Sequence, residues 1–287
     1  MARSKPARTR AAFTLIELLI AILIIGILAT LVTLGVSKAM TYAKQVATKT
    51  EMAQIEQAQG VAAIEMGRVP YIPSYLVLKK TPGEYAGATD PYMMMSGRIL
   101  MQMFPGWTSA SWCPTGGTVV LDATQTYVFF LNGNNGMGFS KGMDPWDTSG
   151  NGKKFGPYFQ FKSERLIPAT WNPSSSTFPA YSDYWDNKSP YIVYSQMMVG
   201  SGNPPVGAGG APPETPTAII AKRQLEGVKK YYMPKGYQIF SAGKDGAWGN
   251  LGYNVTPFNG LVKNADGSEA DDQANFSESP LGKPIND

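Results

Sequence analysis

An uninterrupted apolar run near the N-terminus constrains this chain more than any other feature. Residues 18–36 include no charged side chain and only two hydroxyl groups, those of Thr30 and Thr33. As an α-helix rising about 1.5 Å per residue, the run is roughly 28 Å long, close to the ~30 Å hydrocarbon core of a bilayer. The run therefore predicts one membrane-spanning helix.

A single acid, Glu17, stands at the N-terminal edge of this run. A charged and unpaired carboxylate within a membrane costs roughly 2.5–3.5 kcal/mol on insertion scales, so such a residue usually has a functional partner. The segment before it is basic and has no acid, with Arg3, Lys5, Arg8 and Arg10. Basic residues beside a membrane helix favour the cytoplasmic side, so we expect the N-terminus to be cytoplasmic.

The segment RAAFTLIELLIAILIIGILA, residues 10–29, resembles the class III signal of type IV pilins and type II secretion pseudopilins. The resemblance implies that a prepilin peptidase removes the leader, residues 1–12, by cutting between Ala12 and Phe13. It also implies that Phe13 becomes the N-methylated first residue and that Glu17 is the assembly carboxylate. The family usually has glycine before the cut, where this chain has Ala12, which is also small.

Two partners for the Glu17 carboxylate remain open. After cleavage, the Phe13 amino group is a cation at a helix N-terminus, and both this charge and the helix dipole favour a nearby acid. Glu17 can pair with Phe13 of its own chain. It can instead neutralise the Phe13 amino group of a neighbouring subunit and so set the register of helices in a fibre. Either charge left alone in a low-dielectric bundle is penalised.

The net charge of +4 belongs to the leader. Without its four basic residues, the chain has 21 basic and 21 acidic residues, and no basic stripe follows the membrane run. We therefore expect no nucleic-acid partner. Of the 287 residues, 43% are hydrophobic and 16% are charged, which is typical of a globular domain beyond the membrane helix.

Residue usage also argues against an enzyme. The chain has no histidine, so it has neither a Ser-His-Asp or Cys-His arrangement nor an imidazole zinc site. Its one cysteine, Cys113, cannot form an intrachain disulfide and is expected to be a small buried residue. The acids are scattered and no glycine-rich phosphate loop joins a strand to a helix. We expect no catalytic residues.

The helix is predicted to continue well beyond the membrane. Apolar and small residues recur at intervals of three and four, as at Val46, Thr50, Ala53, Val61 and Ile64. No proline occurs from Phe13 to Met66, so one helix of roughly 50 residues, about 75 Å long, is expected. Residues 13–36 would form the transmembrane and assembly helix, and residues 37–68 an amphipathic continuation packed on a head domain.

The rest of the chain, residues 69–287, is expected to form an extracytoplasmic head. Its patterns predict a helix over 91–104, strands over 118–121, 126–131, 158–161 and 190–194, and a helix over 217–231. Residues 201–216 are mostly proline and glycine and are expected to be a flexible insertion. The predicted fold class is α+β and type IV pilin-like, with a long N-terminal helix packed on a small antiparallel sheet.

Two C-terminal segments carry a second resemblance. GYQIFSAGKDG, residues 236–246, and DDQANF, residues 271–276, resemble segments of major pseudopilins, although the interval between them is longer here. The resemblance implies one structural calcium ion held by Asp245 and by Asp271, Asp272 or both. An alternative is that Asp245 and Gly246 form only a hairpin turn, which the Asp-Gly pair favours by itself.

The function expected from these resemblances is structural. The chain would polymerise into the periplasmic pseudopilus of a type II secretion-like system, anchored in the inner membrane with its head in the periplasm. Its partners would be further copies of itself, the prepilin peptidase, the inner-membrane secretion platform and minor pseudopilins. The alternatives are a type IV pilus subunit, since pilins share the signal, and an extracytoplasmic binding domain that uses the helix only as an anchor.

Overall fold

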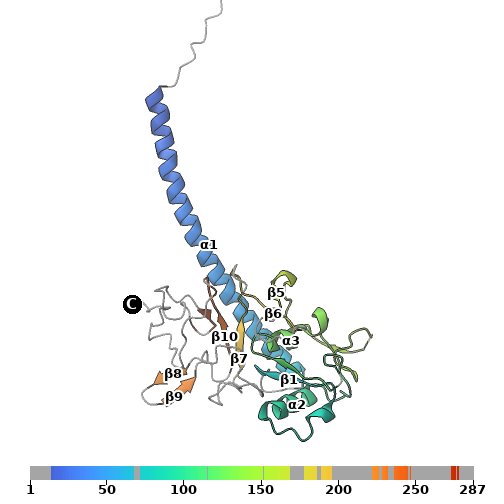
Figure 1. Cartoon of the computed structure of the whole chain (residues 1–287). Helices are drawn as coiled ribbons and strands as arrows, with labels where there is room; N and C mark the ends of the chain where they lie inside the picture. The colour runs from blue at the N-terminus through green and yellow to red at the C-terminus, as the bar shows by residue number, and fades with distance from the viewer. Residues whose placement is uncertain are drawn as a thin grey trace, which may run out of the picture. The chain divides into compact units, whose positions relative to one another are not determined.

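The structure is a computed structural model and consists of two compact units, Met1–Lys44 and Gln45–Asp287 (Figure 1). The residues that it describes are 14–67, 72–114, 116–150, 152–168, 178–185, 189–195, 222–225, 228–231, 236–244, 246, 273–275 and 277. The elements are one long helix, two shorter helices and small antiparallel sheets, which confirms the predicted α+β class.

The long helix α1 spans Leu15–Glu65, 51 residues, and confirms the predicted unbroken helix. Leucine, isoleucine and alanine dominate its sequence and proline is absent, so nothing interrupts the hydrogen-bond ladder. The chain turns at Gly67, whose φ of +93° is unfavourable for other residues. A side chain there would also approach the carbonyl oxygen of Gln102 to 2.5 Å, so both conformation and packing require glycine.

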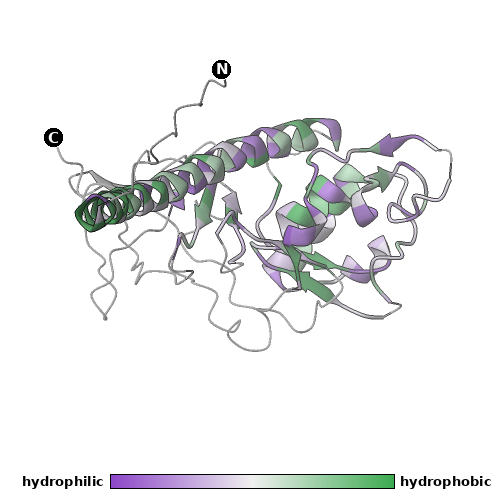
Figure 2. Cartoon of the chain, turned by 90° about the horizontal axis from the view of Figure 1, so that it is seen from above, coloured by the Kyte–Doolittle hydropathy of each residue, from purple (hydrophilic) through white to green (hydrophobic). Residues whose placement is uncertain are grey.

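Within the second unit, α1 buries an unexpected face. Its buried side chains include Met52 and Ile55 but also the polar Thr48, Glu51 and Gln59. In contrast, most of the positions that predicted an amphipathic pattern are exposed, and Ala58 is the buried exception: Val46, Thr50, Ala53, Gln57, Val61 and Ile64 are exposed. Figure 2 shows polar and apolar residues alternating along this part of the helix. The helix therefore presents an uncharged stripe to solvent and buries polar groups together with apolar ones in the head.

The head contains a three-stranded antiparallel sheet in the order β11–β10–β7. Its strands are Gln273–Ala274, Tyr237–Ser241 and Ile192–Ser195. Strand β7 confirms the prediction over 190–194. The C-terminal residues of this sheet are tied to α1, because Asn275 Nδ2 donates to Glu56 Oε2 at 2.9 Å and Lys49 Nζ donates to the Ser277 carbonyl at 2.9 Å.

Another part of the head is built on helix α2, Pro91–Met103. This helix confirms the one predicted over 91–104. Asp90 caps it by accepting a hydrogen bond from the Tyr92 amide at 3.2 Å. Helix α2 packs on β1, which pairs antiparallel with β2. The remaining short elements of the described chain are β1 Leu76–Leu78, η1 Pro82–Tyr85, β2 Val119–Leu121, α3 Thr126–Asn132, η2 Asn134–Gly136, β3 Phe139–Ser140, β4 Lys154–Phe155, η3 Ser163–Arg165, β5 Leu166–Ile167, β6 Ala180–Tyr181, β8 Lys222–Leu225 and β9 Val228–Tyr231.

Three secondary-structure predictions are wrong. Residues 126–131 form helix α3 instead of a strand; Thr126–Leu131 are all buried, and periodicity cannot separate a short buried helix from a buried strand. Residues 158–161 form no strand, because the Tyr158 amide bonds the Leu131 carbonyl at 2.8 Å. The described residues of the segment 217–231 form β8 and β9, not a helix. Gly227 disfavours a helix there and Val228 and Tyr231 favour a strand.

The core of the head is rich in aromatic side chains. Rings of Phe104, Phe129 and Phe139 contact one another and the surrounding tryptophans with centroids 5.1–5.8 Å apart. Such ring pairs contribute beyond the area they bury, by about 0.5–1.5 kcal/mol each. Cys113 is buried in this cluster, as the sequence predicts.

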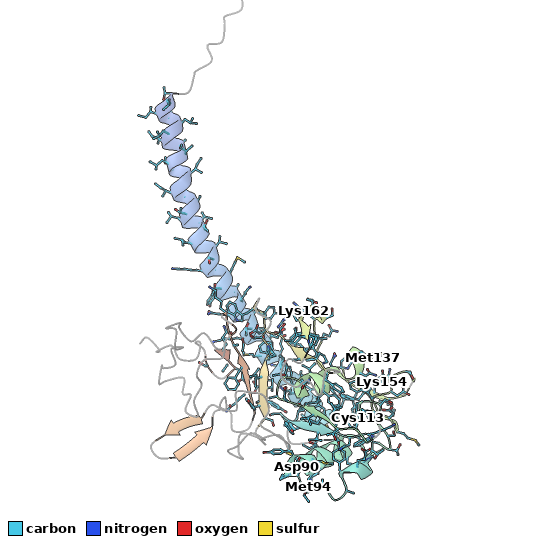
Figure 3. All side chains as sticks on the ribbon, in the orientation of Figure 1. Asp90, Met94, Cys113, Met137, Lys154 and Lys162 are labelled. Atoms are coloured by element: carbon cyan, nitrogen blue, oxygen red, sulfur yellow. The ribbon has the colours of Figure 1, made fainter. Side chains whose placement is uncertain are left out.

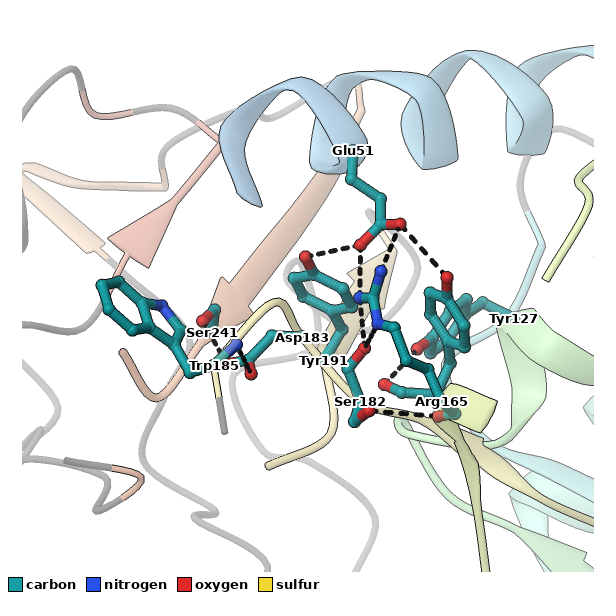
Figure 4. Close-up of polar contacts among 9 residues, drawn as sticks. Glu51, Tyr127, Arg165, Ser182, Asp183, Trp185, Tyr191 and Ser241 are labelled. Atoms are coloured by element: carbon teal, nitrogen blue, oxygen red, sulfur yellow. Dashed lines mark hydrogen bonds and ion pairs between the residues drawn. The ribbon is translucent and has the colours of Figure 1, made fainter. Parts of the chain in front are cut away.

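A buried ion pair joins α1 to the head (Figure 4). The Arg165 guanidinium binds both carboxylate oxygens of Glu51, at 2.9 and 2.6 Å, and the two side chains are only 13% and 6% exposed. The Tyr191 and Tyr181 hydroxyls also donate to the Glu51 carboxylate, at 2.8 and 3.2 Å. Arg165 further donates to the Ser182 carbonyl and lies over the Tyr181 ring, 4.3 Å from its centroid. The two charges are therefore fully partnered although they are removed from water.

Replacing Glu51 with Gln should lower the free energy of unfolding of the head by about 3 kcal/mol, because Arg165 is left as a buried charge without its counter-charge. Thermal unfolding of the full chain in detergent micelles, followed by the near-ultraviolet circular dichroism of the aromatic core, measures the effect. The matched control is Glu164→Gln at an exposed carboxylate. Equal melting of the two variants would contradict the role given to this ion pair.

Candidate functional site

The first candidate site is the start of α1. Thr14 precedes the helix, and its backbone amide and its hydroxyl both donate to the Glu17 carboxylate oxygen Oε2 at 2.8 Å. The Glu17 amide in turn lies 3.3 Å from the Thr14 hydroxyl oxygen. This reciprocal arrangement is a capping box, which satisfies amide groups that a helix start leaves without partners.

The helix that follows this cap is apolar and exposed. Its apolar residues are exposed along the whole of this part, and α1 is long and apolar enough to cross a membrane. Figure 3 shows the side chains of this part projecting into open space on both sides of the ribbon. Exposed apolar side chains over such a length are stable only in lipid or against other apolar surfaces. Glu17 thus holds a carboxylate at the beginning of an apolar rod.

The predicted processing residues Ala12 and Phe13 lie outside the described residues, as does the leader. The pairing of Glu17 with a Phe13 amino group therefore stays a prediction. The structure adds Thr14, which the sequence reasoning missed. The signal was present, because a threonine three residues before a glutamate at the start of an apolar helix is the pattern of a capping box.

A comparison with known protein families bears directly on this segment. Residues 7–33 match the prokaryotic N-terminal methylation motif. The motif indicates a type IV pilin-like N-terminus and, together with the apolar helix, anchoring in a membrane. No curated protein and no solved structure matches the chain. The match covers about a tenth of the chain, so it describes the N-terminal segment and not the head.

The second candidate site is the end of the three-stranded sheet. The calcium candidates Asp245, Asp271 and Asp272 lie outside the described residues. Two described residues near them in the sequence, Ser241 and Gln273, are brought together, because Ser241 of β10 lies directly opposite Gln273 of β11. Among the described residues, no group of three or more acidic, histidine or cysteine side chains is arranged to hold a metal ion.

A buried carboxylate stands beside this strand pair (Figure 4). Asp183 is 2% exposed, and its carboxylate accepts hydrogen bonds from the Ser241 hydroxyl at 2.6 Å and from the Trp185 amide at 3.0 Å. Burial raises the pKa of Asp183 from its usual 3.8 to about 6, and these hydrogen bonds only partly offset the increase. The sequence reasoning did not single out Asp183, because burial decides its chemistry and its neighbours in sequence do not reveal it.

The raised pKa of Asp183 predicts a pH dependence of stability. Between pH 4 and 6 the folded state holds a proton that the unfolded state has released, so stability should fall as pH rises through this window. The total loss should be about 3 kcal/mol, because one pKa unit corresponds to about 1.4 kcal/mol. The variant Asp183→Asn cannot ionise and should lack this loss. Unfolding of both proteins from pH 4 to 7, with a calcium chelator present, provides the test, and parallel curves would refute the prediction.

Proposed function

We propose that this protein is a structural subunit that polymerises through α1 into the pseudopilus of a type II secretion-like system. The observation that carries the proposal is the N-terminal methylation motif placed on an exposed apolar helix with Glu17 as its first acid. An anchor alone has no need of an acid at its membrane edge. In the proposed mechanism, the prepilin peptidase cuts before Phe13, and Glu17 of an incoming subunit meets the Phe13 amino group of its neighbour.

The exposed face of α1 in the second unit supports the assembly role. Val46, Val61 and Ile64 are 46%, 56% and 68% exposed, and the positions between them on this face are uncharged. The helix faces its own head with a mixed set of apolar and polar side chains and leaves this stripe without a partner in the described structure. A second copy of the helix is the occupant that we propose, since two such stripes can bury each other without desolvating a charge.

The C-terminal resemblance favours a secretion pseudopilin over a type IV pilus subunit. Both kinds of subunit use the same N-terminal signal, so the N-terminus does not separate them. Export of a protein cargo across the outer membrane, through contact with an inner-membrane platform and minor pseudopilins, is the role that follows. Imaging filaments in cells that have or lack the secretion ATPase separates the two: pseudopilus filaments should require that ATPase.

The variant Glu17→Gln tests the assembly mechanism. Glutamine at this position can still complete the capping box with Thr14, but it has no charge to neutralise a neighbour's amino group. We expect processed, membrane-inserted protein and at least a tenfold loss of filaments counted by electron microscopy. Ile64→Lys, which places a charge on the exposed stripe, should also reduce filaments, and Met143→Lys on an exposed part of the head should not. Normal filaments from Glu17→Gln would contradict the assembly mechanism, because they would show that assembly needs the capping box and not the charge of Glu17.

We also propose that one structural calcium ion binds at the C-terminal end of the sheet, held by Asp245 and by Asp271, Asp272 or both. The first residue of β11 follows Asp272 directly and supports the fit: the buried amide of Gln273 has no hydrogen-bond partner among the described residues, so its oxygen is available to a cation. Calcium prefers six to eight oxygen ligands, which carboxylates and carbonyls of such loops supply. When bound, it would fasten the C-terminal segment to the sheet.

Removing calcium should therefore lower the melting temperature of the head by about 5 °C or more, the shift expected for a few kcal/mol of binding linkage. Melting the full chain in micelles with calcium, with magnesium and with a chelator measures this effect. The double variant Asp271→Asn with Asp272→Asn should melt like the chelated protein in all three conditions. Identical melting of the unaltered chain with calcium and with chelator would rule the ion out.

A further inference from the structure

The head contains a cavity of about 290 Å³ that neither the assembly role nor the calcium site uses. It lies beside α3 and η2, near the lower limit of the roughly 300–1,000 Å³ typical of small-molecule sites. Four aromatic side chains line it: Phe129, Trp146, Phe161 and Phe178. Its polar groups are the side chains of Asn132, Asn135 and Ser163.

The walls of this cavity are held in place. The Phe129 and Trp146 rings are stacked, with an interplanar angle of 9° and centroids 5.4 Å apart, and Phe178 meets both rings edge-on at 5.5 Å. The Asn134 side chain donates to the Trp146 carbonyl at 2.6 Å, which ties η2 to the tryptophan. Binding to walls that are already ordered loses little conformational entropy.

The loop beside the cavity keeps an unusual backbone. Gly133 has a φ of +64°, and a side chain there would come within 2.2 Å of the Gly138 carbonyl oxygen. Asn135 also has a positive φ, +49°, and its side chain is exposed at the cavity. Non-glycine residues in this conformation carry strain and are concentrated at functional sites.

The cavity is uncharged. None of the described residues that line it has an ionisable side chain. An anion or cation would therefore lose its hydration without gaining a counter-charge, which is costly. The lining instead offers apolar ring surface together with amide and hydroxyl groups, so it suits a neutral ligand with one apolar face and a hydroxyl-bearing edge.

We propose that this cavity binds a pyranose ring of a neutral glycan. The C–H face of a pyranose packs on aromatic rings, whose faces carry partial negative charge, and its hydroxyl groups exchange hydrogen bonds with amides. Trp146 and Phe161 are half-buried, so part of each ring is open to such a ligand. An apolar peptide side chain would fit the rings but would gain no hydrogen bond from the Asn132 and Asn135 amides. The proposal is independent of whether α1 assembles or only anchors the head.

Fluorine NMR of the full chain, labelled with fluorotryptophan and held in a zwitterionic detergent without sugar groups, tests the proposal. The probes are methyl β-D-glucopyranoside, methyl α-D-mannopyranoside, methyl N-acetyl-β-D-glucosaminide and the anionic methyl β-D-glucuronide, with N-acetyl-phenylalanine amide as the apolar peptide probe. We expect at least one neutral glycoside to shift the Trp146 signal saturably, and the glucuronide to bind at least tenfold more weakly. The Trp146 signal is assigned as the one that is absent from the spectrum of Trp146→Phe. If that variant does not fold, each of the other tryptophans is replaced in turn, and the signal that no replacement removes belongs to Trp146.

The variant Asn135→Gly keeps the positive φ and removes only the amide. Its affinity for the glycoside should fall about tenfold, as expected for the loss of a hydrogen bond. The exposed Met143→Ala, which does not line the cavity, should bind as the unaltered chain does. Three results would overturn the proposal: no Trp146 shift with any neutral glycoside, a shift only with N-acetyl-phenylalanine amide, or unchanged affinity in Asn135→Gly.

Discussion

The ion pair between Glu51 and Arg165 is the constraint on which the arrangement of the head depends. Two charges that leave water must meet with good geometry, since either one alone would be strongly destabilising. Glu51 lies on α1 and Arg165 is the last residue of η3, directly before β5, so the pair fixes the register of the helix against the small sheets. Tyr181 at the end of β6 and Tyr191 directly before β7 add donors to the Glu51 carboxylate, so further segments of the head are fixed against the same side chain.

The way in which the head holds α1 leaves one face of the helix free. The head contacts α1 through the ion pair and the two tyrosines together with apolar side chains such as Met52 and Ile55, and Val61 and Ile64 remain exposed. The folded head and the proposed fibre then do not compete for the same side of the helix.

The sequence predicted features that arise from local chemistry. The long helix follows from an apolar run without proline, α2 from Asp-Pro at its start, and β7 from a cluster of β-branched and aromatic residues. Residues 126–131 were predicted wrongly because burial decided their conformation. For residues 217–231, the helix prediction gave too little weight to Gly227 and to the strand preference of Val228 and Tyr231. Asp183 and the aromatic cavity could not be predicted, since both depend on residues distant in the sequence.

In the proposed fibre, the cap formed by Thr14 would affect how subunits come apart. The Glu17 carboxylate already accepts two hydrogen bonds within its own chain, so a neighbour's amino group would add to a satisfied acid or displace one of its donors. A carboxylate released from that neighbour would return to Thr14 instead of facing lipid unpaired. Where a donor is displaced in the fibre, the cap would therefore lower the cost of withdrawing a subunit into the bilayer and raise the cost of extracting one from it by the same amount.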